Sequence, residues 1–123
     1  MQSPALPAAR IIDSPKNLTA MVEDLKKQSA VAIDTESNSL HAYQEQVCLI
    51  QLSTREHDYL LDPIAVPDLE ELGAVFANPE IQKVFHAGDY DLATLKRDFG
   101  FEFRNVFDTM LAATALAEPA LGL

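Results

Sequence analysis

An apolar, strand-like run leads directly into two acidic residues within residues 31–40. Asp34 and Glu36 stand two positions apart, and because side chains alternate between the faces of a strand, both carboxylates point the same way. Two like charges so close together raise each other's pKa unless a cation neutralises them. Mg²⁺ is commonly held by one or two carboxylates together with substrate phosphate oxygens. These ten residues therefore fit a metal site, and they fit equally well a strand end whose acids simply face water.

A second acidic element lies in residues 83–95, where the pattern predicts a short strand, a turn of small residues and a helix. Leu92 and Leu95 recur at helical spacing and give that helix an apolar face. Asp89 and Asp91 fall in its first turn, where the helix dipole favours a carboxylate. Asp89 suits an ordinary N-cap, whereas Asp91 lies beyond the usual cap position. Asp91 is therefore the better candidate for a functional acid.

Two segments resemble exonuclease motifs of the DEDD superfamily of 3′→5′ exonucleases, in the form that the ribonuclease D family carries. The first is Asp34-Thr35-Glu36-x-x-Ser39-Leu40, and the second is His86-Ala87-Gly88-x-x-Asp91-Leu92. Residues 47–54 and 107–110 also look like segments of ribonuclease D and its exosome-associated relatives. The resemblance runs from about Ile11 to the C-terminus, with the motifs in the expected order and spacing. It is therefore far more specific than a single pair of acids.

The resemblance implies hydrolysis of phosphodiesters with two divalent cations, Mg²⁺ or Mn²⁺, as cofactors. One cation would activate the attacking water, and the other would stabilise the leaving 3′ oxygen. By the same resemblance Asp34 would bridge both cations and Glu36 would bind one of them. Asp91 would complete the catalytic and metal-binding set through bound water.

Three further residues would contact the substrate if the resemblance holds. Thr35 would contact the terminal ribose, Leu40 would pack against the terminal base, and His86 would approach the substrate. Two of these roles have ordinary alternatives. Leu40 fits a core leucine about as well. A histidine that closes a strand, such as His86, more often makes a local hydrogen bond.

The resemblance also implies a third motif, in which an aspartate follows a tyrosine or histidine by a few residues. No Tyr-x-x-x-Asp follows Asp91, because Tyr90 is the last tyrosine of the sequence. We therefore expect a partial 3′-5′ exonuclease domain over residues 10–123, preceded by a flexible leader over residues 1–9. Whether this chain is active by itself is left open.

Composition limits the remaining classes of function. At 123 residues and 48% apolar content, the chain fits a single globular domain. No apolar run approaches the roughly 20 residues of a membrane span, and no secretory signal is present. The single cysteine, Cys48, fits a reducing cytoplasm and is expected to be a buried packing residue. The net charge of −10 opposes non-specific binding to nucleic acid, although a metal-dependent site is acidic by necessity.

The expected elements form an antiparallel meander followed by strand–helix repeats. Strands are predicted at residues 10–12, 31–36, 47–53, 58–61, 83–85 and near 106, and helices at residues 19–28, 68–77, 89–99 and 109–117. We expect Thr19 to cap the first helix and Asp108 the last. The short polar link at residues 54–57 favours an antiparallel hairpin.

This order matches the mixed α/β sheet of the ribonuclease H-like fold that the resemblance implies, truncated before its last helices. It argues against a Rossmann domain, which would need a glycine-rich turn after its first strand. It also argues against a response-regulator receiver, which would need helices between its early strands. The sequence therefore predicts an α/β fold of the ribonuclease H-like class.

Three functions fit these observations. An exoribonuclease that acts on the single-stranded 3′ end of RNA is favoured over a proofreading-type DNA exonuclease by residues 47–54 and 107–109. The third function is a non-catalytic remnant that binds nucleic acid or protein. The helix predicted at residues 109–117 is apolar over most of its surface, and such a helix is normally covered on more than one side. We therefore expect self-association or partner binding through it.

Overall fold

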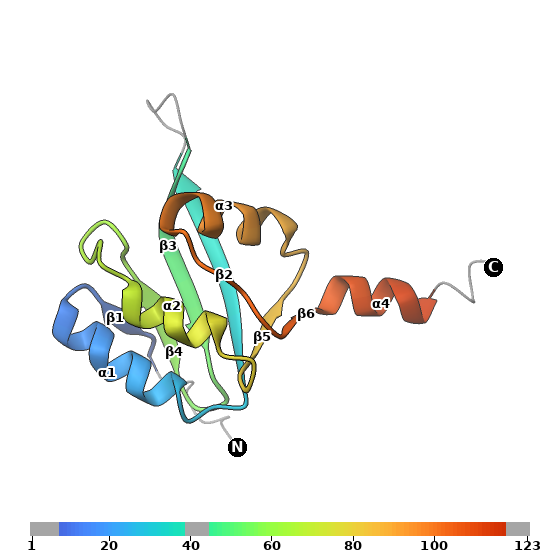
Figure 1. Cartoon of the computed structure of the whole chain (residues 1–123), viewed down its shortest axis with the longest axis horizontal. Coiled ribbons are helices and arrows are strands. Elements are labelled where there is room, and N and C mark those ends of the chain that lie inside the picture. The colour runs from blue at the N-terminus through green and yellow to red at the C-terminus, as the bar shows by residue number, and fades with distance from the viewer. Residues whose placement is uncertain (1–7, 39–44, 118–123) are drawn as a thin grey trace, which may run out of the picture.

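The computed structural model describes residues 8–38 and 45–117 of the chain. The described residues form six strands and four helices, arranged as Figure 1 shows. The elements are β1 (Arg10–Ile12), α1 (Pro15–Leu25), β2 (Ala30–Asn38), β3 (Gln46–Ser53), β4 (Asp58–Leu61), α2 (Glu70–Ala77), β5 (Gln82–Phe85), α3 (Asp89–Phe99), β6 (Val106–Asp108) and α4 (Thr109–Ala117). Within these ranges no helix combines the length and the apolar character needed to cross a lipid bilayer. The leader expected at residues 1–9 lies almost wholly outside the described residues.

The strands form one mixed sheet in the order β1-β4-β3-β2-β5-β6. β2, β3 and β4 pair antiparallel, which confirms the predicted hairpin after residue 53. β5 and β6 continue the sheet in parallel beside β2, and β1 pairs parallel with β4 at the opposite edge. The predicted meander followed by strand–helix repeats is therefore confirmed. β2, one of the two central strands of the sheet, carries the first acidic motif.

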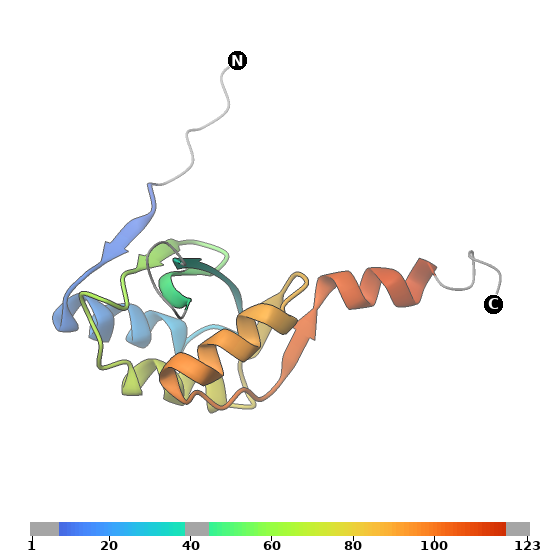
Figure 2. The same cartoon turned by 90° about the horizontal axis from the view of Figure 1, so that it is seen from above.

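Helices α1, α2 and α3 cover one face of this sheet, whereas α4 projects away from the body beyond β6 (Figures 1 and 2). Burial alternates along β2 accordingly: Val31 and Ile33 are buried under the helices, while Ala32 and Asp34 are exposed. Burying each large apolar side chain contributes about 1.5–3 kcal/mol. The face that carries Asp34 is therefore left open by the described helices.

The first helix begins earlier than expected. Ser14 is its N-cap and accepts a hydrogen bond from the Asn17 amide at 3.2 Å, and Pro15 follows at the first helical position. Proline suits that position because it lacks the N–H that would be unpaired there anyway. The predicted start at Thr19 is therefore wrong. Thr19 lies inside α1, and its hydroxyl donates to Glu71 of α2.

Cys48 is half-buried rather than buried, so the expectation that it packs in the core is wrong. The reason is a β-bulge between β2 and β3. Glu36 pairs with Leu49 and Ser37 pairs with Val47, which leaves Cys48 as the extra residue. Bulges bend a strand and redirect the side chains beside them. This one lies directly next to Glu36, at the acidic end of β2.

Candidate acidic active site

Asp34 and Glu36 lie on the open face of β2, and both are exposed. Asp34 stands opposite Gln51 of β3, and Glu36 stands opposite Leu49. Neither acid takes part in either of the two ion pairs found among the described residues, which join Lys26 to Glu23 and Arg97 to Asp98. The prediction that the two carboxylates share a face is confirmed. Their charges are left without a basic partner in that part of the chain.

Asp91 reaches the same strand from the other side. It lies in the first turn of α3, and its Oδ1 atom accepts a hydrogen bond from the Thr35 hydroxyl at 2.5 Å. Burial raises the pKa of the Asp91 carboxyl, the bond from Thr35 opposes that rise, and the negative charge of Asp34 adds to it. Asp91 is therefore close enough to Asp34 for the two charges to repel.

The carboxylate oxygens of Asp34 and Glu36 are chemically suitable ligands for a divalent cation. Carboxylate oxygens are the ligands that Mg²⁺ and Mn²⁺ prefer, and Asp34 and Glu36 present theirs to solvent. Across residues 8–38 and 45–117, however, no three His, Cys, Asp or Glu side chains gather closely enough to hold a metal ion together. The residues therefore fit a cation held directly by Asp34 and Glu36. The role of Asp91 through bound water stays a prediction.

His86 closes β5, and its Nδ1 atom lies 2.8 Å from the hydroxyl oxygen of Thr109. His86 thus makes a structural hydrogen bond, although its partner is 23 residues away in the sequence rather than local. His86 and Thr109 also line a cavity of about 400 Å³ on the open face of the sheet, together with Asp34, Gln51 and Ser53. The structure therefore brings His86 and Asp34 to one cavity, although the two residues are far apart in the sequence.

Of the other two residues assigned to the substrate, Leu40 lies outside the described residues. Thr35 is half-buried, and its hydroxyl is directed to Asp91 rather than to the face that carries Asp34. Its contact with a terminal ribose stays a prediction. Gln51 and Ser53 also border Asp34 in the cavity, although no sequence motif predicts a role for them. Strict alternation along β3 would have placed them on the open face.

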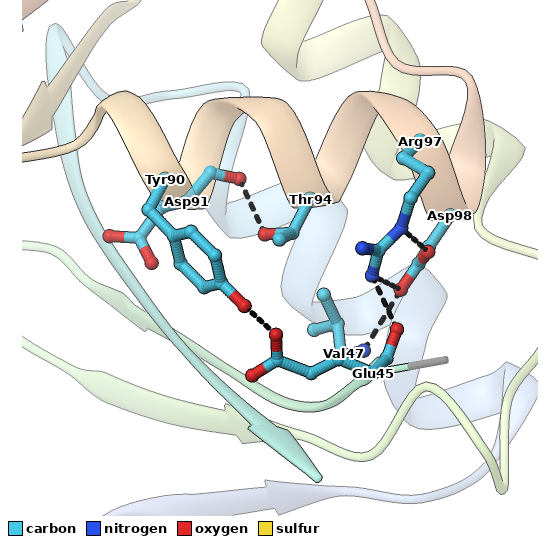
Figure 3. A network of polar contacts seen from close by, with 7 residues as sticks. All are labelled: Glu45, Val47, Tyr90, Asp91, Thr94, Arg97 and Asp98. Atoms are coloured by element: carbon cyan, nitrogen blue, oxygen red, sulfur yellow. Dashed lines mark hydrogen bonds and ion pairs between the residues drawn. The ribbon is translucent and has the colours of Figure 1, made fainter. Parts of the chain in front are cut away.

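A polar network fixes α3 against the start of β3 (Figure 3). The Tyr90 hydroxyl donates to the Glu45 carboxylate, and Arg97 donates from Nη2 to the Glu45 carbonyl at 2.6 Å. Asp98 accepts from the Val47 amide at 2.9 Å and from Arg97 Nε at 2.7 Å. Arg97 is the main reason that the pKa of Asp98 is lowered. These contacts set the position of the helix that carries Asp91.

Comparison with known proteins identifies the class of domain. A family model described as 3′-5′ exonuclease matches residues 9–123. The chain is 41% identical over 109 residues to the exosome complex exonuclease RRP6 of Saccharomyces cerevisiae, an alignment that covers 88% of this chain and 15% of the relative. It is 36% identical over 106 residues to human exosome complex component 10, covering 85% of this chain and 12% of that protein. The chain therefore spans a small part of the length of these relatives.

Solved structures show the same architecture. The catalytic core of RRP6 from Trypanosoma brucei superposes with a TM-score of 0.86 at 35% identity, over 90% of this chain and 31% of that one. Escherichia coli RNase D, an exoribonuclease involved in structured RNA processing, gives a TM-score of 0.81 at 29% identity, over 95% of this chain and 34% of that one. The mixed α/β fold expected from the resemblance is therefore confirmed.

Proposed function

The chain belongs to the ribonuclease D-like family of 3′-5′ exonucleases, and from that premise we propose that it forms the acidic half of a metal-dependent 3′-5′ exoribonuclease site. One observation carries the proposal. Asp34 and Glu36 lie on the open face of β2, and Asp91 is bonded to Thr35 between them in the sequence. The two acidic motifs, joined by Thr35 and Asp91 across 56 residues of sequence, thus meet at one strand.

In this proposal Asp34 and Glu36 would hold the divalent cations, and Asp91 would contact them through bound water. When bound, two such cations activate the attacking water and stabilise the leaving 3′ oxygen. The protein supplies the fixed frame: the β-bulge beside Glu36 and the bond from Thr35 to Asp91 set the direction of the carboxylates.

We propose that the substrate is the single-stranded 3′ end of an RNA. The Nδ1 atom of His86 is hydrogen-bonded to the hydroxyl of Thr109. We assign its Nε2 atom to the substrate phosphate or ribose in the cavity beside Asp34. Thr35 and Leu40 are assigned to the terminal nucleotide, as the family resemblance implies. RNA is favoured because the relatives that share at least 29% identity carry the names of an exosome exonuclease and of RNase D. DNA is the alternative substrate.

The test uses 5′-labelled single-stranded RNA with Mg²⁺ or Mn²⁺, incubated with this chain and with a version extended to carry a third motif. We expect stepwise shortening from a free 3′ hydroxyl and release of mononucleotides. Asp34→Asn should lower the rate by several orders of magnitude, because it removes a ligand of the cations. Asp58→Asn is the matched control, since Asp58 is an exposed acid of the same sheet.

Two comparisons decide the substrate and the direction of attack. An RNA with a 3′ phosphate should be a much poorer substrate than its hydroxyl twin, and equal rates would contradict attack from the 3′ end. Single-stranded DNA of the same sequence should be cut more slowly than RNA. Faster cutting of the DNA would favour the proofreading-type alternative. No hydrolysis by either version, with either cation, would contradict the enzymatic role.

A further inference from the structure

The turn between β5 and α3 lacks a side-chain cap of its own. It consists of His86, Ala87 and Gly88, and its amides precede the first helical turn, where N–H groups have no partner inside the helix. Gly88 is the N-cap of α3 and makes no side-chain capping bond. Ala87 has a φ of 54°, in the left-handed region that side chains other than glycine rarely adopt. This turn therefore depends on contacts from elsewhere.

Asp108 supplies those contacts from the end of β6. Its Oδ1 atom accepts the Ala87 amide at 3.1 Å, and its Oδ2 atom accepts the Gly88 amide at 2.8 Å. The parallel pairing of β5 and β6 places Asp108 beside Phe85, directly next to the turn. The carboxylate of a residue 20 positions away from Gly88 thus satisfies the amides of the turn just before α3.

The same carboxylate also caps its own helix. Oδ1 of Asp108 accepts the amides of Met110 at 2.9 Å and Leu111 at 3.3 Å, at the start of α4. Bonds from backbone amides, that of Gly88 foremost, hold the pKa of Asp108 below its usual range. The charged form is therefore the one that the folded chain stabilises, and charged acceptors make the stronger hydrogen bonds.

From these contacts we propose that Asp108 is a positioning residue for Asp91, an inference that rests on the proposed function of Asp91. The carbonyl of Gly88 accepts the Leu92 amide at 2.8 Å, so the first turn of α3 is built on the residue that Asp108 holds. Asp91 belongs to that turn and meets Thr35 of β2. Asp108 thereby sets where the second acidic motif stands relative to the first.

The variant Asp108→Asn tests this role. It keeps an oxygen for the start of α4, but replaces the acceptor of the Gly88 amide by an NH₂ group. Asp62→Asn is the matched control, because Asp62 Oδ1 accepts the Ile64 amide at 2.9 Å and the Ala65 amide at 3.1 Å in the same local pattern, away from the site. Circular dichroism verifies the fold of each variant.

The readouts are NMR signals of single residues in this chain. In Asp108→Asn, hydrogen exchange of the Gly88 amide should become roughly ten-fold faster or more, as loss of a charge-assisted bond predicts. The carboxyl ¹³C resonance of Asp91 and the Thr35 resonances should move with it. Asp62→Asn should leave these signals in place. A faster Gly88 exchange with unmoved Asp91 and Thr35 resonances would overturn the proposal.

A second variant protects the test against loss of folding. Serine is a good N-cap, so Asp108→Ser retains a cap for α4 while it is too short to reach the turn. It should produce the same displacement of the Asp91 resonance, and an unmoved resonance would likewise overturn the proposal. None of these measurements needs RNA or hydrolysis. The positioning role and the exonuclease function can therefore fail separately.

Discussion

Thr35 donates a hydrogen bond to Asp91 at 2.5 Å, across a separation of 56 residues in the sequence. The bond joins the strand that carries Asp34 and Glu36 to the first turn of α3. It leaves those two acids on the open face and places Asp91 near the covered face of the same strand. The relative position of the two acidic motifs is thus set by a residue that lies inside the first of them.

Replacing Thr35 by valine should separate the two motifs without changing the shape of the side chain much. We expect the free energy of unfolding to fall by about 1.5–3 kcal/mol, the typical contribution of a hydrogen bond to a charged group. The pKa of Asp91 should rise further, because the bond from Thr35 opposes the effect of burial. Chemical denaturation and ¹³C NMR of the metal-free chain measure both.

Thr19→Val is the control for that experiment, since the Thr19 hydroxyl also donates to a carboxylate, that of Glu71, but at an exposed site. Its cost should stay within about 0.5 kcal/mol. A loss in Thr35→Val no larger than in Thr19→Val, with an unchanged pKa of Asp91, would show that the Thr35–Asp91 bond does not form in solution.

Gly88→Ala should destabilise the chain strongly. A Cβ atom at this position would lie 2.4 Å from the Cβ atom of Phe85, which is backbone-proximal and has no room to move. We expect a loss of more than about 2 kcal/mol, as for overpacked core sites. Gly100→Ala is the comparison, because it has open space but a φ of 70°, and should cost about 1 kcal/mol. Thermal melts that rank the two variants in the opposite order would contradict this.

Tyr59 should titrate well above the ordinary pKa of a tyrosine. Burial raises its pKa to about 12, and the hydrogen bond that it donates to Asp24 adds to the effect. Because the folded chain holds this proton more tightly than the unfolded chain, the contribution of Tyr59 to stability is present below pH 10 and is lost as the pH rises towards 12. Ultraviolet absorbance should show a tyrosinate transition near pH 12 that is absent in Tyr59→Phe. Titration of every tyrosine near pH 10 would contradict the burial.

Helix α4 should mediate self-association of this chain. Met110, Leu111 and Leu116 expose 48%, 61% and 84% of their surface, and α4 projects from the body (Figure 2). Exposed apolar surface of this kind favours association. Leu111→Lys should shift the mass measured by light scattering towards that of the monomer. Ala20→Lys, at an exposed position of α1, should leave the mass unchanged. A wild-type chain that is monomeric at high concentration would contradict this expectation.

Local patterns in the sequence predicted most of the fold. The bounds of α3 and α4 are those expected. Apolar spacing marks α3, Gly100 ends that helix in the left-handed conformation, and Asp108 caps the start of α4. The predicted start of α1 at Thr19 is wrong because the serine–proline pair at residues 14–15 is the stronger N-terminal signal. The half-buried state of Cys48 depends on a β-bulge, and a bulge is a property of strand pairing that local spacing does not reveal.

The contacts between distant residues were beyond what the sequence could predict. Asp108 was expected as the cap of α4, and it is one, but its bonds to Ala87 and Gly88 require β6 to lie beside β5. Lys83 is fully buried, and its ammonium group donates hydrogen bonds to the carbonyls of Asn78 and Arg104. The residue type alone would predict an exposed side chain, because lysine is almost never fully buried. Such side-chain partners are decided by the tertiary arrangement rather than by periodicity.

The most direct test of the central claim is the binding of Mn²⁺, measured by electron paramagnetic resonance of the free ion. The claim is that Asp34 and Glu36 on the open face of β2 hold a divalent cation. The wild-type chain should bind Mn²⁺ weakly, Asp34→Asn should lose that binding, and Asp58→Asn should retain it. Identical binding by the wild-type chain and Asp34→Asn would contradict the claim.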